Sequence, residues 1–252
     1  MDFTMDTFDS LLTTMPIADV ASAFWDSTLP GQAIVILLFL GSAAAWTIMW
    51  TKGTELRFAS ASSTEFLTAF RAGANPVSLH LRAEDHAGSP LNTIYKDGCR
   101  ALEAELQAQG LHVAEMGDSV SDSYRRLTLN QLEALRTVVD RNVADEALNL
   151  ENQMGLLATA VSAAPFLGLL GTVWGVMDAF SGMAISGSAA LSAVAPGISG
   201  ALLTTIVGLL VALPSMIGYN MLSAHIRRIS VQMDNFAQEF ISEIQNTYVR
   251  EG

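Results

Sequence analysis

Apolar residues are gathered into three long blocks of this chain, and polar residues fill the stretches between them. The blocks are Ala33–Trp50, Leu156–Phe180 and roughly Leu191–Leu222. Each is long enough to cross a bilayer as a helix, which takes about 20 residues at a rise of ~1.5 Å. Hydrophobic residues make up 50% of the chain, yet they are not spread along it as the core of one soluble domain would require. The pattern predicts an all-α integral membrane protein with three transmembrane helices.

A helical stripe of apolar residues continues beyond two of these blocks. Apolar positions at steps of three and four fill Leu132–Val139, and no Gly or Pro follows up to Gln153, where the second span is expected to begin. A similar stripe occupies Ile226–Tyr248, so one helix is expected over Leu191–Tyr248. The second and third transmembrane helices should therefore extend into a cytoplasmic helical bundle. Their stripes are covered there either by the same chain or by further copies of it.

The distribution of basic residues predicts the topology. All 13 Lys and Arg residues lie at positions 52–141 or after position 225, and basic residues favour the cytoplasmic side of a membrane. Residues 1–30 contain acids and no cation, so they lack the positive region of a cleavable signal peptide. The predicted organisation is a periplasmic N-terminal segment (1–30), first span (31–51), cytoplasmic helical domain (52–153), second span (154–180), periplasmic link (181–190), third span (191–222) and cytoplasmic C-terminal helix (223–252).

Composition and motifs argue against several classes of function. A net charge of −12 and a pI near 4.6 argue against nucleic-acid binding, which calls for a basic patch. Cys99 is the single cysteine, which rules out an intramolecular disulfide and a thiolate metal cluster. The turn-like Gly197–Gly200 resembles a nucleophile motif, but the nearest His, His225, lies ~39 Å along a helix from Ser199. We expect no catalytic residue, no metal, no cofactor and no enzyme.

Small residues recur at helical spacing within the second and third blocks. Such residues let membrane helices approach closely, so we assign them to helix packing. Prolines in the same blocks are expected to break the helices. The packing residues are Gly168, Gly175, Gly200, Thr204 and Gly208, and the expected breaks are Pro165, Pro196 and Pro214.

Two hydroxyls near the middle of these blocks, on Thr172 and Thr205, have two interpretations. Each can bond to a backbone carbonyl of its own helix, or the two can line an ion path. The apolar cores contain no Asp, Glu, Lys, Arg or His, so a proton path would need a carboxylate from another polypeptide. Asp178, at the outer end of the second block, is either a solvated residue or an acid at the periplasmic mouth.

The stretches Ala164–Met177 and Val194–Ile198, followed by Thr205, Pro214 and Tyr219–Asn220, resemble the TolQ/ExbB/MotA proton-channel family. The match is strong over roughly Leu156–Asn220 and only general over Phe58–Ser119. The tail Asp234–Phe240 resembles the TolQ branch more than the ExbB branch. Where these two branches usually carry a Glu, this chain has Gly200.

The resemblance implies a homopentameric ring in the bacterial inner membrane, around the single-span helices of a TolR/ExbD-type partner dimer. That partner supplies the titratable Asp, and Thr172 and Thr205 match the family's pore-lining threonines. Proton flow would drive a TolA/TonB-type transducer.

The sequence is compatible with three functions. The leading one is a TolQ-like stator of a Tol-Pal system, and the second is an ExbB-like energiser of TonB-dependent transport. The third is a non-conducting scaffold, which would tolerate loss of both hydroxyls.

Overall fold

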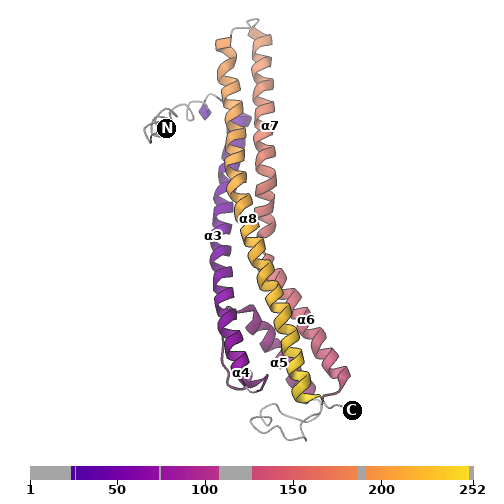
Figure 1. Cartoon of the computed structure of the whole chain (residues 1–252). Helices are drawn as coiled ribbons and strands as arrows, with labels where there is room; N and C mark the ends of the chain where they lie inside the picture. Colours follow the sequence, from indigo (N-terminus) through magenta and orange to yellow (C-terminus); the bar gives the residue numbers. More distant parts are fainter. Residues whose placement is uncertain (1–23, 26, 74, 108–126, 187–190, 250–252) are drawn as a thin grey trace, which may run out of the picture. The chain divides into compact units, whose positions relative to one another are not determined.

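The computed structural model describes residues 24–25, 27–73, 75–107, 127–186 and 191–249 (Figure 1). Residues 1–23 of the expected N-terminal segment and residues 187–190 of the expected link lie outside the described residues. Helices α3 to α8 make up most of the described chain. No strand forms within the described ranges, where one isolated bridge joins Leu127 and Val249.

Among the described residues, three helices are long and apolar enough to cross a membrane: α3 (Leu29–Ala72), α7 (Met154–Ser186) and α8 (Leu191–Tyr248). This confirms the predicted all-α fold with three spans, and α8 is unbroken over the expected range. In the most apolar window of each helix, 17%, 22% and 44% of the residues are buried, in that order. The third span therefore has the largest buried share of the three.

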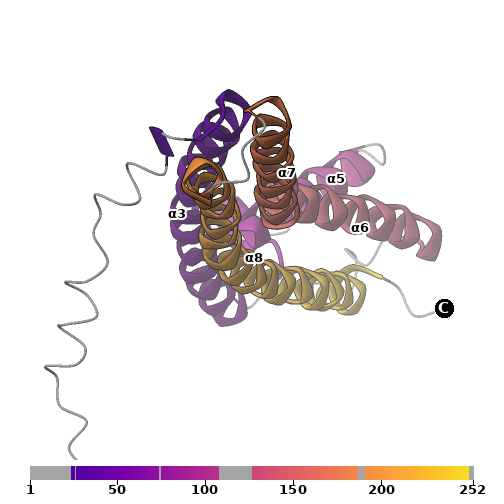
Figure 2. The ribbon, with the colours of Figure 1, turned by 90° about the horizontal axis from the view of Figure 1, so that it is seen from above.

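The chain divides into two compact units, which we call the span unit and the bundle unit. The span unit comprises Met1–Met49 and Met154–Tyr219, and the bundle unit comprises Trp50–Gln153 and Asn220–Gly252. In the span unit, the N-terminal half of α8 lies beside α7 (Figures 1 and 2). Helices α3 and α8 contribute residues to both units.

The second span does not continue from the preceding helix, contrary to the sequence prediction. Helix α6 (Leu129–Glu151) ends before Asn152, whose N–H donates to the carbonyl of Asn149, and α7 begins at Met154. Between them Gln153 adopts a left-handed backbone conformation with φ 70°. One residue in this conformation ends the α-helical hydrogen-bond ladder. The two spans that extend into the bundle unit are therefore those of α3 and α8.

Local sequence sets the ends of the shorter helices in the bundle unit. Helix α5 (Pro90–Gln107) begins with a proline, which needs no N–H partner in the first turn, and Ser89 caps it by accepting from the N–H of Asn92. Helix α6 begins with a capping box, in which the side chains of Thr128 and Gln131 accept from each other's backbone N–H. The short α4 (Ser78–Leu81) precedes both.

Aromatic rings fill the core of the bundle unit. Phe236 of α8 lies edge-on to Phe66 and to Phe70 of α3, with ring centroids 5.2 Å apart in both pairs. Tyr95 of α5 lies edge-on to Phe240 at 5.5 Å. Such contacts add to the stabilisation from burial, and they join α3, α5 and α8.

Two polar features of the same unit are well defined. Arg71 of α3 donates two hydrogen bonds, of 2.8 and 2.7 Å, to the carboxylate of Glu239 of α8. This pairing lowers the pKa of Glu239. Cys99 is 1% exposed, and burial raises the pKa of its thiol to about 12.

Candidate functional site

Helices α7 and α8 lie side by side (Figure 2), and glycines occupy their points of closest contact. A Cβ atom on Gly208 would lie 2.6 Å from the carbonyl oxygen of Ala164, and one on Gly168 would lie 2.8 Å from the carbonyl oxygen of Thr204. Real Cβ atoms essentially never come so close to another heavy atom. A larger residue at either glycine would therefore push the two backbones apart.

Gly171 is a further contact point, outside the predicted set of packing residues. A Cβ atom there would lie 2.6 Å from the Cβ of Thr204, and one on Gly175 would lie 2.7 Å from the Cβ of Ala201. Gly168, Gly171 and Gly175 follow one another at steps of three and four, which puts them on one face of α7. That spacing is the sequence signal that could have identified Gly171.

Two hydroxyls of α8 bind the same backbone carbonyl of α7. The Oγ1 atom of Thr204 lies 2.9 Å from the carbonyl oxygen of Gly168, and that of Thr205 lies 3.2 Å from it. The Thr204 hydroxyl also lies 2.7 Å from the carbonyl oxygen of Ala201 in its own helix. Thr204 is only 1% exposed, whereas Thr205 is half-buried. Thr204 thus lies inside the interface and Thr205 at its edge.

Thr172 and Thr205 are brought together through the backbone of α7. The hydroxyl of Thr172 donates a 2.7 Å hydrogen bond to the carbonyl of Leu169. The preceding carbonyl, that of Gly168, receives the Thr205 hydroxyl, and in an α-helix it also accepts the N–H of Thr172. The two half-buried threonines therefore bind successive carbonyls at one edge of the interface.

The other predicted site residues are placed differently. Asp178 is exposed on α7, about 120° around the helix from Thr172, so the two do not share a face. Gly200 is buried in α8.

The prolines that were expected to break the helices lie inside them. Pro165 is within α7, and Pro196 and Pro214 are within α8, both of which continue through these positions. Next to Pro214, the hydroxyl of Ser215 donates a 2.7 Å bond to the carbonyl of Val211. Hydroxyls of this kind help to satisfy backbone groups near a proline in a membrane helix.

The interface offers hydroxyls and carbonyls but no group that titrates. Residues 154–177 and 179–224 contain no Asp, Glu, Lys, Arg or His. Hydroxyls can donate to a carboxylate and can accept from a hydrated ion, but they do not release a proton at physiological pH. Among the residues that the structure describes, no group of three or more His, Cys, Asp or Glu could hold a metal. The arrangement is suited to contacting a titratable group of another polypeptide.

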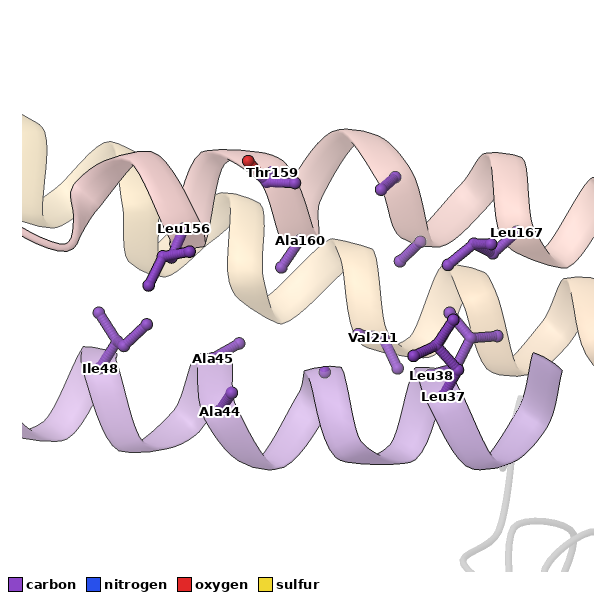
Figure 3. Close-up of a pocket in the computed structure, with 13 residues that line it drawn as sticks. Leu37, Leu38, Ala44, Ala45, Ile48, Leu156, Thr159, Ala160, Leu167 and Val211 are labelled. Atoms are coloured by element: carbon purple, nitrogen blue, oxygen red, sulfur yellow. The ribbon is translucent and has the colours of Figure 1, made fainter. Parts of the chain in front are cut away.

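A groove between α3 and α7 is a separate feature of the span unit (Figure 3). It encloses about 290 Å³, and Leu37, Leu38 and Ile48 of α3 point into it opposite Leu156 and Leu167 of α7. The one polar lining side chain, that of Thr159, donates to the carbonyl of Gly155 in its own helix. This almost entirely apolar lining argues against an ion path along the groove.

Comparison with known proteins gives consistent matches. Residues 100–235 match the model of the MotA/TolQ/ExbB proton channel family. The chain is 31% identical to the Tol-Pal system protein TolQ of Pseudomonas aeruginosa, over 83% of the chain and 85% of that protein. It is 32% identical to the biopolymer transport protein ExbB of Xanthomonas campestris pv. campestris, over 82% and 78%. It is also 29% identical to TolQ of Haemophilus influenzae, over 86% and 90%.

Proposed function

The chain belongs to the MotA/TolQ/ExbB proton channel family, and on that premise we propose that it is a stator subunit that converts proton flow into mechanical work on the cell envelope. It is a multi-pass protein of the inner membrane. The basic residues between positions 52 and 141 and after 225 support a periplasmic N-terminus and a cytoplasmic C-terminus.

One observation carries the proposal: Thr172 and Thr205 lie at one edge of a tight helix contact, within residues 154–177 and 179–224, which contain no Asp, Glu, Lys, Arg or His. A proton path along this edge needs a carboxyl group from elsewhere. A single-span TolR/ExbD-type dimer would supply it as an Asp, inside a ring of five copies of this chain. The exposed apolar residues of α7, including Phe166 and Val173, leave surface for such contacts.

The proposal also concerns which envelope pathway the protein serves, that of TolQ or that of ExbB. Relatives of the TolQ and ExbB types are similarly identical to this chain, at 31% and 32%, so overall identity does not separate them. The tail Asp234–Phe240 favours the TolQ branch. We therefore place the chain in a Tol-Pal system with a TolA-type transducer, with ExbB-like service to TonB-dependent transport as the alternative. Complementation of two bacterial strains, one lacking TolQ and one lacking ExbB, separates the two, since only the matching strain should be rescued.

Ion flux in proteoliposomes tests the function itself. The protein is reconstituted with the TolR/ExbD-type protein encoded beside it, and proton uptake is followed under an imposed pH gradient. Thr205→Val removes the hydroxyl at nearly constant volume, and it should abolish partner-dependent flux without dissolving the oligomer. Thr159→Val is the matched control, because the Thr159 hydroxyl bonds within its own helix and lies in the apolar groove. Equal flux in wild type and Thr205→Val, or no flux from a verified complex, would favour a scaffold instead.

A further inference from the structure

We propose that Thr204 is a positioning residue, which determines whether the Thr205 hydroxyl is free to bind the carboxyl group of the partner. The inference rests on the proposed function, in which Thr205 faces that carboxyl group. Its basis is the sharing of one carbonyl, that of Gly168, between the two neighbouring hydroxyls.

The carbonyl of Gly168 cannot accept all the donors around it at once. A carbonyl oxygen has two lone pairs, and within α7 one of them takes the N–H of Thr172. The hydroxyls of Thr204 and Thr205, at 2.9 and 3.2 Å, therefore compete for the other. The remaining lone pair of the Gly168 carbonyl can accept the proton of only one of these two hydroxyls.

The Thr204 hydroxyl has a second acceptor, and this gives the pair two arrangements. When Thr204 donates to the carbonyl of Ala201, 2.7 Å away, Thr205 can donate to Gly168. When Thr204 donates to Gly168, the proton of Thr205 is released for a group outside the interface. Rotation of the two hydroxyls about their Cβ–Oγ1 bonds exchanges the arrangements, and such local motions are fast compared with helix movements.

The surroundings of Thr204 restrict it to this indirect role. The side chain is 1% exposed and fits against Gly171, where an added Cβ atom would lie 2.6 Å from the Thr204 Cβ and 2.8 Å from its Cγ2. It therefore cannot reach a partner helix itself. Thr205 is half-buried at the edge and can do so.

The test measures the protonation midpoint of the partner's intramembrane carboxyl group by isotope-edited infrared titration of the assembled complex. This readout does not require flux. In Thr204→Val the Gly168 carbonyl is left to Thr205 alone, so the carboxylate loses a donor. Hydrogen bonds to an ionised group favour that form, so the midpoint should rise by about one pH unit. Thr204→Ser keeps the hydroxyl and should retain the wild-type midpoint.

A combination with Thr205→Val separates positioning from packing. Thr205→Val alone should raise the midpoint, and adding Thr204→Val should raise it no further, since the two act through one donor. Thr204→Ala, which has a smaller side chain, gives the same midpoint as Thr204→Val and replaces it if the valine variant fails to assemble. An unchanged midpoint in an assembled Thr204→Val or Thr204→Ala complex would overturn the inference. It would also be overturned if Thr204→Val raised the midpoint of the Thr205→Val protein as much as it raises that of the wild type.

The two proposals fail in different ways. If Thr205→Val changes neither flux nor the midpoint, the proposed pore face is wrong, and the inference falls with it. If Thr205→Val changes both while Thr204→Val and Thr204→Ala change neither, only the role of Thr204 is wrong.

Discussion

The hydroxyl of Thr205 on α8 lies 3.2 Å from the carbonyl oxygen of Gly168 on α7. Gly168 is also a residue whose missing side chain lets the two helices touch. The same backbone unit thus sets the distance between the helices and accepts the hydroxyl that we place on the proton path. Changes in helix packing here should therefore also alter the polar contact.

The helix contact at Gly208 should not tolerate even a methyl group. A Cβ atom there would lie 2.6 Å from a backbone oxygen, so Gly208→Ala should cost about 1–3 kcal/mol of stability and weaken assembly. Gly208→Leu should prevent assembly. Gly182→Ala is the control on α7, because the added Cβ would meet no described atom within 4 Å beyond its chain neighbours and the adjacent backbone of its own helix. Size-exclusion chromatography and thermal unfolding of the detergent-solubilised protein measure both effects, and an intact ring from Gly208→Leu would refute the packing assignment.

Asp178→Asn tests the proposed acid at the periplasmic mouth. Because Asp178 is about 120° around α7 from Thr172, we expect the variant to retain wild-type proton flux with the partner present. The measurement is proteoliposome flux at several external pH values. A clear loss of flux would establish that this carboxylate takes part in proton entry.

Cys99 should not react with maleimides in the folded protein. It is 1% exposed, and burial raises its pKa to about 12, so the thiol stays protonated at neutral pH. Mass spectrometry should show an adduct only after denaturation, and the single cysteine makes that mass unambiguous. A Cys99→Ser, Glu65→Cys variant, with its thiol at an exposed position of α3, should label at once. Rapid labelling of native Cys99 would show that the α5 face opens in solution.

The ion pair between Arg71 and Glu239 should give a small, acid-sensitive stabilisation. The Arg71 hydrogen bonds lower the pKa of Glu239 below its ordinary 4.5, so the stabilisation is present at neutral pH. It is lost as the pH falls below 4.5 through the pKa of the folded state. Arg71 is 61% exposed and Glu239 30%, so a double-mutant cycle with Arg71→Gln and Glu239→Gln should give about 1 kcal/mol or less. Urea unfolding measures the coupling, and an equal value in acid and at neutral pH would contradict it.

Truncation of the aromatic core should be much more costly. Phe240 is fully buried between α3 and α5, so Phe240→Ala should lower the free energy of unfolding by about 3–5 kcal/mol. Val231→Ala, at a position of α8 that is 53% exposed, should have little effect. Thermal unfolding followed by circular dichroism compares the two, and similar losses would place Phe240 outside the core.

The sequence predicts the spans well because a bilayer demands long, continuous apolar helices, and the stripe in Ile226–Tyr248 predicts the extension of α8. It does not predict the interruption at Gln153, because neither Gly nor Pro marks a left-handed residue there. The extension of α3 to Ala72 was missed as well. Its buried positions Leu56, Ala59, Ser63, Phe66 and Phe70 recur at steps of three and four, although polar neighbours obscure the pattern.

The candidate site was predicted only in part. The spacing of small residues indicates which glycines lie on one face of a helix, but not which atoms of the other helix they meet. Thr204 and Thr205 are adjacent in sequence and chemically identical. Only the approach of α7 places one inside the interface and the other at its edge.

The close contacts of α7 and α8 are of two kinds, which differ in whether a second substitution can compensate for a change of the glycine. An alanine at Gly171 would collide with the side chain of Thr204, and a smaller residue at position 204 could make room for it. An alanine at Gly208 would instead collide with the backbone of Ala164, which no substitution can shorten. A genetic screen for second-site suppressors should thus recover partners for Gly171 and none at the contact of Gly208. Of the two glycines, only Gly171 can be replaced together with a compensating substitution at the residue that it contacts.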